Sequence, residues 1–99
     1  MLQAQIFLDE GDKGPDAPLY EYILRYLMKS GLKGATLFRA DFGFGSRQQL
    51  HAPSRFGGLD ERPIMITFID VEKKVLEAII HIKPLLKDGL LATQFVEVW

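Results

Sequence analysis

Apolar and polar residues alternate along the first segment of the chain. Between Leu2 and Leu8 every second side chain is apolar, and this period of two predicts a half-buried strand. Residues 19–28 instead carry apolar side chains at helical spacing, which predicts a helix. Pro18 suits the first turn of this helix, because the N–H that proline lacks would have no partner there. Gly31 fits a left-handed cap at its end.

The rest of the chain continues this pattern. Residues 35–42 and 64–69 predict two strands, and the nearly continuous apolar run of the latter is typical of a central strand. Apolar positions at helical spacing from about Glu72 predict a second helix. Pro84 should kink this helix and Gly89 should end it.

A last strand over 91–99 completes the order strand, helix, strand, strand, helix, strand. Two β-α-β halves with right-handed crossovers predict an α+β, ferredoxin-like βαββαβ fold, with a four-stranded antiparallel sheet and two helices on one face. A single domain spans 1–99. The aromatic residues expected on the other, bare face include Phe7, Phe38, Phe42, Phe68 and Phe95. An exposed apolar face of that kind predicts oligomerisation.

Composition narrows the classes of function. The 99 residues carry 12 basic and 13 acidic side chains, for a net charge of −1, which argues against a nucleic-acid surface that works by charge alone. The absence of cysteine excludes thiol catalysis and thiolate metal sites. Apolar runs fall short of the roughly 20 residues of a membrane span, and the N-terminus lacks a signal-peptide pattern. We therefore expect a cytoplasmic protein without direct membrane insertion.

The end of the second predicted strand is the most informative place for function. Gly43-Phe44-Gly45 leads there into a polar loop from 46 to 60. Glycine lets a backbone approach a ligand closely, and loops of this length in small domains are usually functional or disordered. A simple turn or bulge at the strand end is the alternative interpretation.

Charged and aromatic residues around this loop leave several roles open. The locally basic residues are Arg39, Arg47, His51, Arg55 and Arg62. They form either an anion site or solvated loop charge, and Arg39 is expected in packing or in an intersubunit ion pair. His51 has no neighbouring ligand in sequence, so no metal site is predicted.

An acidic segment precedes the first predicted helix. Its residues Asp9, Glu10, Asp12 and Asp16 predict a solvated loop whose negative charge stabilises the helix N-terminus. Tyr22 and Tyr26 are expected in helix packing or at a subunit contact.

Three sets of motifs support a resemblance to a known family. They are Pro18-Leu19-Tyr20-Glu21, then Gly31-Leu32-Lys33-Gly34-Ala35-Thr36 through Gly43-Phe44-Gly45 to His51, and finally Leu59 to Pro63, Ile69-Asp70 and Lys87-Asp88-Gly89-Leu90. In these segments the chain resembles the PII-like proteins, and most closely the branch called domain of unknown function 190. The resemblance implies a homotrimer whose sheets face the three-fold axis.

The resemblance also implies a signalling or regulatory function. An adenine nucleotide (AMP, ADP or ATP) or another small anion would bind between subunits. The residues that would contact it are Gly43, Phe44, Gly45, Ser46, Arg47, Gln48, Lys87 and Gly89. The loop 46–58, with His51 and Arg55, would contact a partner protein. Family genes often lie beside fluoride-channel genes, so the implied partner is a membrane transport protein.

Other classes of function fit the sequence less well. Acylphosphatases share the size and fold, but their basic, glycine-rich anion loop lies between the first strand and the first helix, where this chain is acidic. Because no nucleophile–base pair is visible either, we expect no enzyme. Phe42 to Gly45 differs in position from an aromatic RNA-binding motif, so no nucleic-acid partner is expected. A small anion-handling enzyme of the acylphosphatase-like fold and an oligomeric adaptor without any ligand stay as the alternatives.

Overall fold

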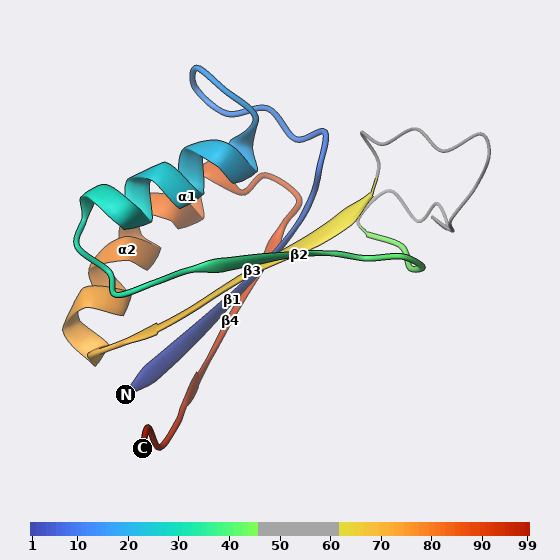
Figure 1. Ribbon diagram of the computed structural model, residues 1–99. Helices are drawn as coiled ribbons and strands as arrows, with labels where there is room; N and C mark the ends of the chain where they lie inside the picture. Colours follow the sequence, from blue (N-terminus) through green and yellow to red (C-terminus); the bar gives the residue numbers. More distant parts are fainter. Residues whose placement is uncertain (46–61) are drawn as a thin grey trace.

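The structure is a computed structural model that describes residues 1–45 and 62–99. Its elements are β1 (Leu2–Asp9), α1 (Leu19–Lys29), β2 (Thr36–Arg39), β3 (Pro63–Asp70), α2 (Glu72–Ile82), the 3-10 helix η2 (Lys83–Leu85) and β4 (Leu90–Phe95). The four strands form one antiparallel sheet in the order β2-β3-β1-β4. Both helices cover the same face of the sheet (Figure 1). The predicted ferredoxin-like fold is confirmed.

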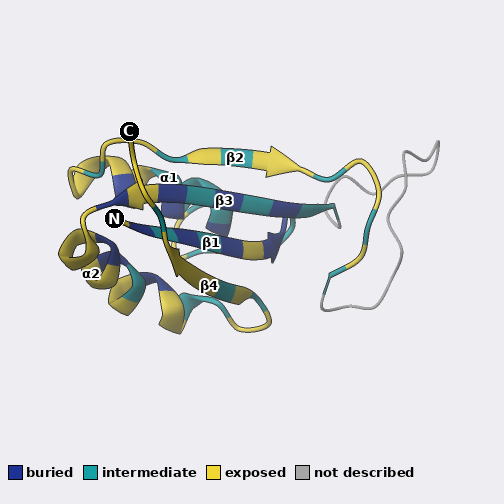
Figure 2. Cartoon of the chain, turned by 90° about the horizontal axis from the view of Figure 1, so that it is seen from below, coloured by how far each residue is buried: buried dark blue, intermediate teal, exposed yellow. Residues whose placement is uncertain are grey.

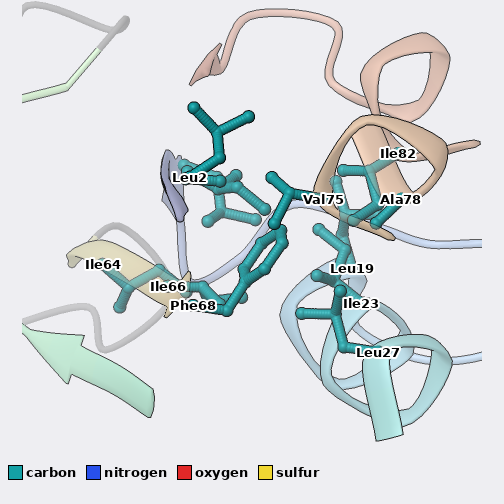
Figure 3. Packing of buried hydrophobic residues seen from close by; sticks show 13 residues of the cluster. Leu2, Leu19, Ile23, Leu27, Ile64, Ile66, Phe68, Val75, Ala78 and Ile82 are labelled. Carbon is teal, nitrogen blue, oxygen red and sulfur yellow. The ribbon is translucent and has the colours of Figure 1, made fainter. Parts of the chain in front are cut away.

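The core lies between the sheet and the two helices (Figure 3). Every second residue of β1 from Leu2 to Leu8 is buried, as the alternation predicted. The helices contribute Leu19, Ile23, Leu27, Val75, Ala78 and Ile82. Figure 2 shows that the central strands β1 and β3 are largely buried, whereas the edge strands β2 and β4 are largely exposed. The two middle strands therefore carry most of the strand contribution to the core.

Strand register corrects two of the expected aromatic positions. Phe68 pairs with Ala4, so it points toward the helices and is buried. Phe95 pairs with Leu2 and thus also belongs to the helix side of the sheet, where it lies at the exposed edge. Phe42 follows the end of β2 and belongs to no strand. Of the five phenylalanines expected on the open face, register places only Phe7 and Phe38 there.

The open face has an apolar row and a polar ladder. The apolar row crosses all four strands and consists of Phe38, Met65, Phe7 and Leu90. In the polar ladder, Gln94 donates to Gln3 over 2.9 Å and Gln3 donates to Thr67 over 3.0 Å. The apolar row therefore lies toward the end of the sheet where β1 ends, and Ile69, which pairs with Gln3, adds an exposed apolar side chain nearer the other end.

Several element ends differ from the prediction. Pro18 precedes α1 as its N-cap residue, so it lies just before the helix rather than in its first turn. β2 covers only 36–39 instead of 35–42, and β4 ends at Phe95 instead of continuing to residue 99. Pro84 does not kink a continuing helix: α2 ends at Ile82 and passes into η2, well before Gly89. Proline lacks the N–H of the α-helical ladder, which explains the early end.

Gly31 ends α1 in the way the sequence predicted. Its φ is +81°, its N–H donates to Met28 O, and the N–H of Leu32 donates to Leu27 O. This is a Schellman motif, in which a left-handed residue lets two backbone bonds close the helix end.

Replacing Gly31 with alanine is expected to lower the free energy of unfolding by about 1–2 kcal/mol, because a left-handed backbone brings Cβ against the following carbonyl. The measurement is urea unfolding. Gly34→Ala is the matched control, since Gly34 has open space around its Cβ position and no positive φ. Equal losses for both variants would contradict this role of Gly31.

Candidate functional site

A cleft lies at the end of the sheet where β1 ends and where β3 and β4 begin. Its volume is about 390 Å³. Register brings its walls together, because Asp9 pairs with Pro63 and Phe7 pairs with Leu90. The lining residues are Phe7, Leu8, Asp9, Asp12, Phe44, Gly45, Pro63, Ile64, Asp88 and Leu90. The cleft is thus mainly apolar, with three carboxylates among its polar groups, and it adjoins the start of the segment 46–61.

The two glycines after β2 have different surroundings. A Cβ on Gly45 would lie 2.6 Å from Asp9 Oδ1, so any side chain there would displace the Asp9 carboxylate. A Cβ on Gly43 would meet no atom within 4 Å. The close neighbour of the Gly45 backbone is therefore a carboxylate of the chain itself, and Gly43 has no such steric requirement. The approach of this backbone to a ligand stays a prediction.

The acidic connection between β1 and α1 differs from the solvated loop that was expected. Asp9 is buried, and its N–H donates to Asp12 Oδ2 over 3.1 Å. The N–H of Leu19 donates to Asp12 O over 2.9 Å. Because these bonds connect the strand end to the helix start, the acidic residues here organise the connection rather than only interacting with water.

Arg39 is the basic residue of β2 and lies on the helix side of the sheet. Its Nε donates to Glu10 Oε2 over 2.9 Å, and its guanidinium lies 5.7 Å from the centre of the Tyr20 ring. The hydrogen bond that Arg39 donates to the Glu10 carboxylate, together with the negative charge of that carboxylate, raises the pKa of Arg39 above its usual value. This ion pair lies within one chain and was not anticipated, while the contact with the Tyr20 ring agrees with a packing role. An intersubunit ion pair of Arg39 stays a prediction.

The residues before β4 have separate roles. A Cβ on Gly89 would lie 2.8 Å from Phe7 O and 3.2 Å from Leu86 Cδ2, so the glycine allows β4 to begin tightly against β1. Lys87 is not part of the cleft. It lines a smaller adjoining hollow with Lys13, and Asp12 and Asp88 are common to both hollows. The structure thus places Phe44, Gly45 and the Lys87–Gly89 turn at the same end of the sheet.

The remaining predicted site residues lie outside the described residues. They are Ser46, Arg47, Gln48, His51 and Arg55.

Sequence reasoning missed a cluster between the helices and part of the cleft. The Tyr22 hydroxyl and His81 Nε2 share a hydrogen bond of 2.9 Å, and the rings of Tyr26 and His81 stack with centroids 4.0 Å apart. The two tyrosines therefore pack against α2, which agrees with the packing alternative. The cleft residues Phe7 and Leu90 were not predicted as site residues, because their neighbourhood follows from the β1–β4 register.

The described residues contain no candidate metal site and no candidate membrane-spanning helix. Within residues 1–45 and 62–99, no three His, Cys, Asp or Glu side chains are grouped so that they could hold a metal ion. None of the helices described there has the length and apolar character needed to cross a membrane.

Comparisons with known proteins agree with this architecture. Residues 1–98 match the model of the family DUF190, described as an uncharacterized ACR. A UPF0166 protein of Aquifex aeolicus is 32% identical over 94 residues, which cover 95% of this chain and 89% of that protein. A UPF0166 protein of Methanocaldococcus jannaschii is 30% identical over 71 residues, or 72% of this chain and 65% of that protein.

Solved structures show the same fold. The PII-like protein CPII of Thiomonas intermedia K12, determined with ADP and bicarbonate bound, superposes with a TM-score of 0.70 at 21% identity, covering 98% of this chain and 86% of that one. The chain therefore belongs to the DUF190 family and has the fold of the PII-like proteins.

Proposed function

We propose that this chain is a PII-like regulatory protein without enzymatic activity, which assembles as a homotrimer and binds an adenine nucleotide at the cleft between Phe7, Phe44 and Leu90. Binding would be passed to a protein partner through residues 46–58. The observation that carries the proposal is the position of the cleft, which opens directly beside Phe44 and Gly45, where that segment begins. The structural relative CPII was determined with ADP and AMP bound, which supports the class of ligand.

The chemistry of the cleft fits the base better than the phosphates. Aromatic and aliphatic walls suit a nucleobase, which stacks on aromatic side chains. The described lining has carboxylates but no basic side chain, and carboxylates repel phosphate. Lys13 and Lys87 line the adjoining hollow, so we expect the phosphates to extend toward these two lysines. This orientation agrees with the role that the family resemblance implies for Lys87.

Assembly is supported by the open face of the sheet. Its apolar row of Phe38, Met65, Phe7 and Leu90 faces away from both helices. Phe38 is 53% exposed and Leu90 is 62% exposed, and contiguous exposed apolar surface of this kind marks an interaction site. A second copy that covers this row would also close the side of the cleft formed by Phe7 and Leu90. A membrane transport protein stays the predicted partner class.

Replacing Phe44 with alanine is expected to weaken ADP binding by about 5- to 150-fold, because loss of one base–aromatic stack costs about 1–3 kcal/mol. Titration calorimetry on the assembled protein measures the affinity. Phe42→Ala is the matched control: Phe42 is 65% exposed, like Phe44 at 60%, but does not line the cleft.

The same samples distinguish the alternatives. If the wild-type protein is an oligomer that binds no adenine nucleotide, the ligand proposal is wrong and an adaptor without ligand takes its place. If both variants bind ADP equally, the nucleotide does not lie against Phe44. A monomer in light scattering would contradict the proposed assembly.

A further inference from the structure

The segment after β4, Val96–Trp99, forms an arm that is anchored at its first residue. The N–H of Val96 donates to Met1 O over 2.9 Å, and the Met1 amino group donates to Val96 O over 3.0 Å. These two bonds extend the β1–β4 pairing by one step beyond the pair Leu2–Phe95. The direction in which the arm leaves the sheet is therefore set by backbone hydrogen bonds.

The arm leaves the sheet on the side opposite the helices. Figure 1 shows the C-terminus on that side. Figure 2, which looks at the sheet from below, shows the arm crossing the ends of β1 and β3 toward β2. Both views agree that the arm projects over the open face, the same face that carries the apolar row.

The arm is mainly apolar, and its last two residues are exposed in the part of the chain that the structure describes. Trp99 is 106% exposed and Val98 is 55% exposed. Together with Val96, Glu97 and Met1 they border a hollow of about 460 Å³. An aromatic side chain buries roughly 150–250 Å² when it is covered. One chain thus has a large apolar side chain in water and, next to it, a shallow hollow that is bordered by Met1, the apolar residues of the arm and the Glu97 side chain.

We infer that Trp99 of one copy inserts into the hollow beside Met1 and Val98 of the next copy, so that the arms lock the assembly at one end. The inference rests on the proposed homotrimer. Copies arranged around one axis with their open faces inward bring the same end of each sheet together, and hence the three arms. Because each arm carries both the inserting Trp99 side chain and the hollow that receives one, the contact between two copies is head-to-tail. Such contacts close when the copies form a ring.

The charge of the arm favours a second copy over other occupants. Its side chains are three apolar residues and Glu97, and the one positive group beside it among the hollow's described residues is the Met1 amino group, which is bonded to Val96 O. The arm thus lacks the cluster of basic side chains that would attract an anionic membrane surface or a nucleic acid. An apolar surface with a single charge is typical of the buried centre of homomeric interfaces.

Trp99 is the only tryptophan of the chain, so its fluorescence reports on the arm alone. In the assembled protein we expect blue-shifted emission and a several-fold smaller acrylamide quenching constant than in the urea-unfolded chain. Val98→Asp would place a charge in the hollow while keeping the reporter, and it is expected to remove the shift and the protection. Ile80→Asp is the control, because Ile80 is 75% exposed on α2, on the helix side of the sheet.

Light scattering on the same samples tests the assembly separately from the contact made by the arm. An oligomer in which Trp99 is as accessible as in the unfolded chain would overturn the arm contact and leave the assembly intact. Protection that persists in Val98→Asp would also overturn it. A monomeric wild-type protein would remove the assembly, and the arm contact with it.

Discussion

Replacing Ile66 with alanine is expected to lower the free energy of unfolding by about 2–5 kcal/mol. Ile66 lies in the middle of β3, pairs with Ile6 on one side and Leu37 on the other, and has no exposed surface. The loss combines the transfer of apolar atoms with a cavity that the central strands cannot collapse to fill. Since small domains are stable by only about 5–15 kcal/mol, this loss is a large part of the total.

Urea unfolding at a fixed protomer concentration measures this loss, because assembly adds a concentration-dependent contribution. Ile80→Ala removes the same atoms from a side chain that is 75% exposed, and it is expected to change stability by no more than about 0.5 kcal/mol. A loss for Ile66→Ala as small as that of the control would mean that the sheet does not carry the core that the structure shows.

The elements that the sequence predicted best are those with an unambiguous period or a special backbone residue. Alternation from Leu2 to Leu8 predicted both the existence of β1 and which of its side chains are buried. Helical spacing together with Gly31 predicted α1 and its end. In both cases the local pattern and the tertiary packing require the same conformation, so no long-range information is needed.

The sequence did not predict which side of the sheet a side chain occupies where the local pattern of apolar residues is uniform. β3 reads as a nearly continuous apolar run, so its composition does not tell which side Phe68 occupies. Only pairing with Ala4 places it in the core. The same holds for Phe95, whose side is fixed by its pairing with Leu2. Strand register depends on contacts between distant segments, and a single sequence does not contain it explicitly.

The candidate site was likewise predicted only in part from the sequence. The sequence identified the Gly43–Gly45 exit and the turn before β4, and the structure places Phe44, Gly45 and that turn at one end of the sheet. It did not identify Asp9 as a buried residue that requires glycine at position 45. Acidic residues in a loop usually predict solvated charge, and only the tertiary contact with Gly45 reveals the close packing.

Replacing Asp70 with asparagine is expected to destabilise the fold more than any exchange of an exposed carboxylate. Asp70 is buried at the end of β3. Its Oδ1 accepts the N–H of Val71 at the start of α2 over 2.7 Å, and its Oδ2 accepts the N–H of Lys33 before β2 over 3.0 Å. One carboxylate thus joins two connections of the fold. Asparagine keeps one acceptor and turns an NH₂ group toward the second donor, which leaves a backbone N–H unpaired.

The loss of stability caused by Asp70→Asn should depend on pH, and it should be larger at neutral pH than in acid. The hydrogen bonds from Val71 and Lys33 lower the pKa of Asp70 in the folded chain, whereas in the unfolded chain it is about 3.9. The unfolded state then binds more protons, so the contribution of Asp70 is present above about pH 4 and is lost as the pH falls through the folded pKa. Asparagine does not titrate, so the stability gap between wild type and Asp70→Asn should be widest near neutral pH and should close in acid.

Urea unfolding across this range measures the gap, with Asp16→Asn at an exposed loop position as the control. A gap of constant size from neutral to acid would mean that Asp70 acts through its shape and not through its charge.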